Sequence, residues 1–133
     1  MSILYSREPD LSVTEFQAVL VSSTLAERRP VHDLQCLDKM LRNADVVVTA
    51  RDDSKLVGIS RAITDFSFCC YLSDLAVDVS YQGRGIGRAL IEQTHIAAGR
   101  DTTLFLVAAP AVQGYYPKVG MKPYPCFGIQ PSK

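Results

Sequence analysis

A strand pattern changes into a helix pattern within LAVDVSYQGRGIGRALIEQT (residues 75–94), and three glycines lie at the change. They are Gly83, Gly85 and Gly87. Glycine destabilises a helix interior, so its repetition at a helix start needs a physical reason. The first N–H groups of a helix lack intrahelical partners and carry partial positive charge, and glycine lets an anion approach them closely. The segment therefore predicts a phosphate-binding turn, with Arg84 and Arg88 adding charge at its rim.

Two familiar phosphate loops do not fit this turn. The dinucleotide pattern G-x-G-x-x-G ends on Arg88 in one register and on Leu90 in the other, and no Gly-Lys-Ser/Thr ending is present. The pattern that fits is Q/R-x-x-G-x-G/A, met by Gln82, Gly85 and Gly87. Together with the preceding LAV, this segment resembles the GNAT (Gcn5-related N-acetyltransferase) superfamily.

The resemblance implies acetyl-CoA as the acetyl donor. The residues that carry over as the pyrophosphate-binding turn are Gly83, Arg84, Gly85, Ile86, Gly87 and Arg88. The residues that carry over as the strand pairing with the pantetheine arm are Leu75, Ala76 and Val77. In the family this strand and the next parallel strand splay apart, so that exposed backbone groups bond the ligand's amides.

A second segment, YYPKVGM (residues 115–121), resembles the family's Y-x-x-x-G-F pattern. In many members the tyrosine protonates the departing thiolate, and here that position is Tyr116. The segment departs from the family in Met121, where Phe is usual, and in Ala109, where an Asn often contacts the cofactor. Because Pro117 biases Tyr116 away from helical geometry, Tyr115 is the alternative acid.

Acetyl transfer to an amine also needs an oxyanion donor and a route for the ammonium proton, since an alkylammonium has a pKa near ~10. The resemblance to the family implies that a backbone N–H near Val77 is the hydrogen-bond donor to the oxyanion. Asp74 is our candidate base because it directly precedes the cofactor strand, and Asp65 and Asp78 are alternatives. A solvated acid is the competing interpretation of Asp74. His95, expected to face water, and His32, expected on the polar surface, are not predicted to be catalytic.

Composition narrows the class of protein. The chain has 133 residues, 14 basic and 14 acidic side chains, and 47% hydrophobic residues, which predicts one globular domain over residues 1–133. Neutral charge argues against nucleic-acid and membrane partners. No signal peptide or membrane span is recognised, so we expect a cytoplasmic protein. The four cysteines and two histidines lack metal-site spacing, which predicts reduced thiols and no metal.

The hydrophobic pattern predicts an α/β (α+β) domain with a mixed, mostly antiparallel sheet, a splayed parallel strand pair and helices on both faces. A helix capped by Ser12 and a second helix after Pro30 precede three strands that form an antiparallel meander. After the glycine turn we expect a helix to Ala98 with Gly99 as its C-cap. The remaining expectations are a doubly covered strand over residues 103–108, a short helix from Pro110 and a last strand over residues 126–129.

The functional prediction is an acetyl-CoA-dependent N-acetyltransferase that acts on a primary amine of a small molecule or peptide. The alternative is a non-catalytic acyl-CoA-binding sensor or regulatory module. In the family the acceptor site is shaped by the two N-terminal helices and their connection, here residues 24–33. Arg28 and Arg29 in this connection could recognise an anionic part of the acceptor. Because family members often dimerise, the resemblance also allows a homodimer.

Overall fold

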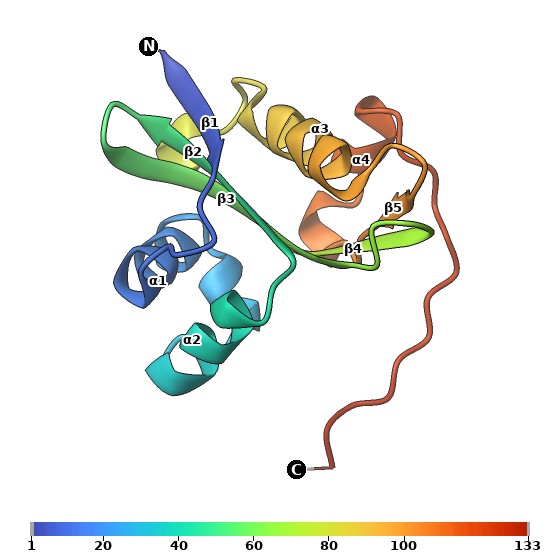
Figure 1. Ribbon diagram of the computed structural model, residues 1–133, viewed down its shortest axis with the longest axis horizontal. Coiled ribbons are helices and arrows are strands. Elements are labelled where there is room, and N and C mark those ends of the chain that lie inside the picture. The colour runs from blue at the N-terminus through green and yellow to red at the C-terminus, as the bar shows by residue number, and fades with distance from the viewer. Residues whose placement is uncertain (1, 133) are drawn as a thin grey trace.

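The computed structural model describes residues 2–132, which form a mixed sheet with helices on both faces (Figure 1). The strands are β1 (Ile3–Arg7), β2 (Val46–Asp52), β3 (Lys55–Thr64), β4 (Cys69–Val77) and β5 (Thr103–Phe105). The α-helices are α1 (Val13–Ser22), α2 (Leu34–Arg42), α3 (Ile86–Ala98) and α4 (Tyr115–Lys118). Single turns of 3₁₀ helix lie at η1 (Leu25–Arg28), η2 (Val79–Tyr81) and η3 (Pro110–Val112).

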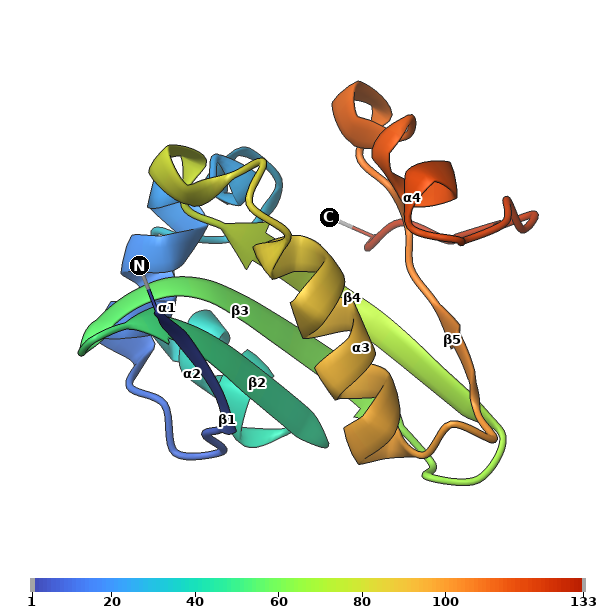
Figure 2. The ribbon, with the colours of Figure 1, turned by 90° about the horizontal axis from the view of Figure 1, so that it is seen from above.

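The five strands follow one another in sequence order across the sheet, and every pair is antiparallel except β4 and β5. Helix α3 supplies the crossover that this parallel pair requires and lies on the face opposite α1 and α2 (Figure 2). The predicted mixed sheet with helices on both faces is therefore confirmed.

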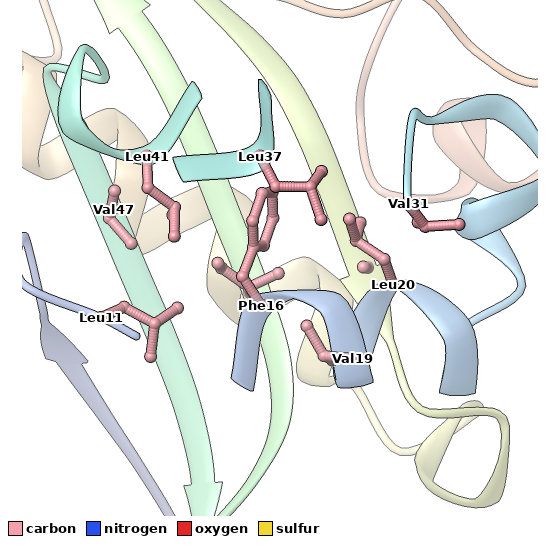
Figure 3. Packing of buried hydrophobic residues seen from close by; sticks show 10 residues of the cluster. Leu11, Phe16, Val19, Leu20, Val31, Leu37, Leu41 and Val47 are labelled. Atoms are coloured by element: carbon pink, nitrogen blue, oxygen red, sulfur yellow. The ribbon is translucent and has the colours of Figure 1, made fainter. Parts of the chain in front are cut away.

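Hydrophobic side chains of the central strands alternate between the two faces. Val47 and Ile59 pack with Phe16, Leu20 and other residues of the α1 and α2 layer (Figure 3). Val46, Val48 and Val57 belong to the second cluster, where the α3 residues Ile86 and Leu90 cover them. Because both faces are covered, consecutive residues in the middle of β2 and β3 are buried.

Helix ends follow the predicted capping signals. The Ser12 hydroxyl accepts a hydrogen bond from the Glu15 amide at 3.1 Å, which fixes the start of α1. Gly99, at φ 105°, ends α3, and its amide donates to carbonyls of the last turn. No helix in residues 2–132 is long and apolar enough to cross a bilayer.

The C-terminal third differs from the prediction. Strand β5 ends at Phe105 rather than residue 108, and Phe105 and Val107 are exposed rather than covered on both faces. Residues 126–129 form no strand and are exposed, so no described strand lies on the outer side of β5 (Figure 1). Hydrophobic composition predicted burial here, but burial requires a neighbouring element that this part of the chain does not provide.

Candidate active site

The glycine turn joins η2 to α3 and brings backbone N–H groups to the start of that helix. Gly83 and Gly85 have φ angles of 79° and 82°, a left-handed conformation that glycine adopts without strain. Gly85 is the N-cap of α3 and has no side chain to cap the helix. In residues 2–132, no backbone carbonyl outside the regular elements and no side chain accepts from the amides of Gly85, Ile86, Gly87 or Arg88. The turn therefore presents unpaired N–H groups at a positive helix end.

Side chains around the turn fix its position and place positive charge near it. The Gln82 side-chain amide donates to the Val77 carbonyl at 3.0 Å, which ties the turn to the end of β4. The Arg84 guanidinium lies 5.1 Å from the centre of the Tyr81 ring, a cation–π distance. Beyond the turn, Arg88 and Arg100 help to line a groove of ≈ 380 Å³ along α3. Glu92 also lines this groove and pairs with Arg100 at 3.7 Å, so Arg84 and Arg88 are the positive charges nearest the turn.

Strands β4 and β5 separate soon after they meet. Their pairing consists of Cys69 with Thr103, Cys70 with Leu104 and Tyr71 with Phe105, and β4 then continues to Val77 without β5. On its other edge β4 stays paired with β3 along this length. The separation leaves β4 backbone between Leu72 and Val77 facing an opening, as the predicted splayed pair requires.

A cleft of ≈ 250 Å³ lies at this opening, between the α1–α2 connection and the segment that follows β5. Its lining combines aromatic, aliphatic and basic side chains, and no aspartate or glutamate is among them. The lining residues with polar side chains are Arg28, Arg29, Tyr71, Ser73 and Tyr116. Segments that are far apart in the sequence therefore meet where β4 and β5 diverge.

The two adjacent tyrosines of α4 occupy different places. Tyr116 is partly buried and lines the cleft, whereas the Tyr115 hydroxyl lies over Gly87 on α3. Their rings meet edge to face with centroids 5.2 Å apart. Burial raises the pKa of Tyr116 above its ordinary value, and nearby Tyr115 raises it further. A phenol in this setting stays protonated at neutral pH and can donate a proton.

Asp74 lies beside the cleft but is completely buried and ion-paired. Its Oδ1 accepts a hydrogen bond from Arg29 Nε at 2.6 Å, and its Oδ2 accepts one from Arg61 Nε. Arg29 also donates to the Ser73 carbonyl at 2.7 Å. Because both carboxylate oxygens face guanidinium groups, this geometry favours an anchoring role for Asp74 over the base role suggested by the sequence.

The other acids and histidines considered as bases are engaged in local structure. Asp65 Oδ1 accepts from the amides of Ser67, Phe68 and Cys69, which holds the pKa of Asp65 below its usual value. Asp78 caps η2. The expectation that His95 faces water is wrong, because its Nε2 lies 2.8 Å from the Thr102 carbonyl oxygen and the residue is partly buried. His32 is exposed, as expected.

Sequence reasoning did not identify Arg61 or Ser73 as parts of this region. Arg61 Nη2 donates to the Ser73 hydroxyl at 3.0 Å, and its Nη1 donates to the Met40 carbonyl. An arginine within the apolar strand β3 was the available signal, since a charged residue is seldom fully buried unless it is paired. Its partner could not be read from the sequence, because strand pairing brings Arg61 opposite Asp74.

Comparison with known proteins identifies the family of this chain. Residues 43–123 match the model of the acetyltransferase (GNAT) domain family, and the chain belongs to this family. A histone acetyltransferase from Glycine max is 31% identical over 102 residues, which cover 68% of this chain. The match covers 42% of that protein, and a match to a probable acetyltransferase from the same plant covers 39% of the second protein, so the chain spans less than half the length of these relatives.

Solved structures with the same fold include acetyltransferases from several sources. A probable acetyltransferase from meticillin-resistant Staphylococcus aureus superposes with a TM-score of 0.79 at 21% identity, covering 97% of this chain and 99% of that one. An aminoglycoside acetyltransferase from an uncultured soil metagenomic sample, in complex with sisomicin, superposes with a TM-score of 0.74 at 20% identity. The superposition covers 98% of this chain and 97% of that one. These similarities confirm the predicted fold.

Proposed function

We propose that this protein is an acetyl-CoA-dependent N-acetyltransferase that acetylates a primary amine of a small molecule or peptide. GNAT acetyltransferases use acetyl-CoA and act on an acceptor substrate. The observation that carries the proposal is the sequence of three features along β4. Beyond Tyr71 this strand has no neighbouring strand on the β5 side, Tyr116 lines the cleft at that point, and the turn that follows β4 has amides at Gly85 to Arg88 with no acceptor in the described chain. Histones and aminoglycosides, named for two relatives, both offer primary amines, which supports an amine acceptor.

The residues of the turn and of β4 fit acetyl-CoA as the acetyl donor. The turn formed by Gly83, Arg84, Gly85, Ile86, Gly87 and Arg88 would hold the pyrophosphate. The backbone of Leu75, Ala76 and Val77 would pair with the pantetheine arm, and a β-carbon at Gly83 or Gly85 would meet open space, so ligand access is unobstructed. When bound, acetyl-CoA supplies a thioester whose acetyl group is open to attack by a neutral amine.

Proton transfer would then be divided between Tyr116 and water. The raised pKa of Tyr116 keeps its hydroxyl protonated, as a general acid for the leaving thiolate requires. A backbone N–H near Val77 is the proposed oxyanion donor, and such a donor contributes roughly 3–4 kcal/mol in other enzymes. Because both oxygens of Asp74 are bonded to arginines, we assign removal of the ammonium proton to water in the open cleft.

The competing function is a non-catalytic acyl-CoA-binding module. Both functions predict binding of CoA, but only the enzyme releases free thiol when an amine is supplied. The test incubates the protein with acetyl-CoA and an amine panel, measures thiol release, and measures CoA binding by calorimetry in parallel. Release that depends on both the amine and Tyr116 supports the enzyme. Binding without release from any amine supports the module.

We also retain the homodimer as a proposal. The outer edge of β5 has no partner among the described strands, and an open edge offers backbone groups to a second chain. Phe127 and Ile129 in the following segment are 96% and 100% exposed. Light scattering of the protein and of the Phe127→Ser, Ile129→Ser double variant tests the idea. A dimeric protein with a monomeric variant supports it, and a monomeric protein contradicts it.

A further inference from the structure

We propose that the acceptor is a small amine that also carries an anionic group, a carboxylate or a phosphate, and that Arg28 is the residue that binds this group. The proposal rests on the N-acetyltransferase function proposed above. It divides roles between Arg28 and Arg29, which are adjacent in the sequence and both line the cleft. The division follows from their contacts.

Arg29 is fully engaged within the protein. Its Nε donates to Asp74, its Nη2 to the Ser73 carbonyl at 2.7 Å and its Nη1 to the Arg28 carbonyl at 2.8 Å. Its side chain retains only 21% exposure. Arg29 therefore fixes the end of η1 against β4, and through its bond to the Arg28 carbonyl it sets the position of the neighbouring residue.

The side chain of Arg28, unlike that of Arg29, makes no contact of this kind within residues 2–132. It is exposed, it is the last residue of η1, and its guanidinium has no hydrogen bond or ion pair with any residue of the described chain. The neighbouring acid, Glu27, does not line the cleft. An arginine that lines a cleft and has no partner for its guanidinium donors is suited to a carboxylate or phosphate, which it can bind through two parallel hydrogen bonds.

The net charge around the cleft also favours an anionic acceptor. Asp74, Arg29 and Arg61 together carry one net positive charge, and Arg28 adds a second. With no carboxylate in the lining, a polycationic acceptor would meet uncompensated positive charge. The cleft volume of ≈ 250 Å³ is also below the roughly 300–1,000 Å³ of pockets for drug-sized ligands, which favours a small acceptor. An anionic amine satisfies both conditions.

The experiment compares amines of matched length and different charge. With acetyl-CoA and the full chain, kcat/KM for thiol release is measured for 4-aminobutyrate, 4-amino-1-butanol and 1,4-diaminobutane. A second pair, phosphoethanolamine and ethanolamine, separates a phosphate from a carboxylate. We expect the anionic member of each set to exceed the neutral one by about tenfold or more, and the diamine to be the poorest acceptor.

Variants then assign the preference to Arg28. Arg28→Gln should bring the anionic-to-neutral ratio close to one, mainly through KM, and Arg28→Glu should favour the diamine. Glu27→Gln is the matched control on the same turn and should keep the wild-type ratio. Equal or better use of neutral and cationic amines, or a ratio that Arg28→Gln leaves unchanged, would overturn the proposal while leaving the N-acetyltransferase function intact.

A binding measurement distinguishes failure of this inference from failure of the function. Calorimetry with CoA bound, which cannot transfer an acetyl group, reports acceptor binding without turnover. Binding of an anionic amine that is lost in Arg28→Gln supports the anionic site even if no thiol is released in the kinetic assay. Absence of both binding and thiol release for every anionic amine overturns it.

Discussion

The hydroxyl oxygen of Tyr115 lies 2.9 Å from the point where a β-carbon on Gly87 would stand. This contact joins α4 to the first turn of α3, and it explains the third glycine of the turn differently from the first two. Gly83 and Gly85 are needed for their positive φ, with open space around them. Gly87 is needed because another side chain lies against its backbone.

The contact predicts that Gly87 and Tyr115 are energetically coupled. Alanine is favoured over glycine in a helix by up to about 1 kcal/mol, but the Tyr115 hydroxyl must move to admit it. Gly87→Ala should therefore stabilise a Tyr115→Phe protein more than the wild-type protein. A double-mutant cycle of urea unfolding measures the difference, and additive effects would contradict the coupling.

Gly85→Ala should weaken both the turn and CoA binding. At a φ of 82° an alanine costs about 1–2 kcal/mol, although its β-carbon would meet nothing within 4 Å. The main-chain amides would then relax away from the anion-binding arrangement. Urea unfolding and CoA calorimetry measure the two effects. Gly114→Ala is the matched control, since Gly114 has a φ of −69° and equally open surroundings, and it should change neither quantity appreciably.

Asp74→Asn should be strongly destabilising. It removes the charge that compensates Arg29 and Arg61 in a fully buried position, a change that costs roughly 3–5 kcal/mol in comparable pairs. The control is Asp38→Asn, whose pair with Arg42 is exposed and should contribute less than about 1 kcal/mol. Were Asp74→Asn to unfold like the wild type while losing the acidic limb of its pH–rate profile, the base role would be restored.

Tyr116→Phe should lower kcat by about 100-fold or more, the usual contribution of a general acid, with little change in CoA affinity. Since burial raises the pKa of Tyr116 above the ordinary value of about 10 for a tyrosine, its proton is retained throughout neutral and mildly alkaline pH. The wild-type rate should therefore not fall on this account below about pH 10. Tyr124→Phe, at an exposed position, is the control. A larger loss from Tyr115→Phe than from Tyr116→Phe would reverse the assignment.

Glu8 should make stability dependent on acid pH. Hydrogen bonds from Arg51 hold the folded-state pKa of Glu8 below the ordinary value for a glutamate, although burial opposes this shift. Because the folded pKa is lowered, the stabilisation is complete above the unfolded value and is lost as pH falls through the folded value. Urea unfolding between about pH 6 and pH 3 should show a smaller loss of stability for Glu8→Gln than for wild type.

Local signals accounted for much of the fold. The Ser12 and Gly99 caps, the hairpin of β2 and β3, and the glycine turn depend on interactions within a few residues, and the structure contains each of them. The family also followed from one short segment, because phosphate-binding turns need glycine at particular positions. The end of β5 could not be predicted in this way, since the strand depends on a neighbour rather than on its own residues.

Thus the order of elements as far as β5, the turn and the family could be determined from the sequence, because each is encoded by neighbouring residues. Tertiary structure alone decided that Asp74 would be enclosed by two arginines 45 and 13 residues away, and that adjacent tyrosines would face different sites. Only the tertiary structure distinguished the role of Arg29, whose guanidinium is bonded within the protein, from that of Arg28, whose guanidinium is not bonded to any described residue. The physical reason is that the role of a charged or phenolic group is set by the partners around it, and those partners come from distant parts of the chain.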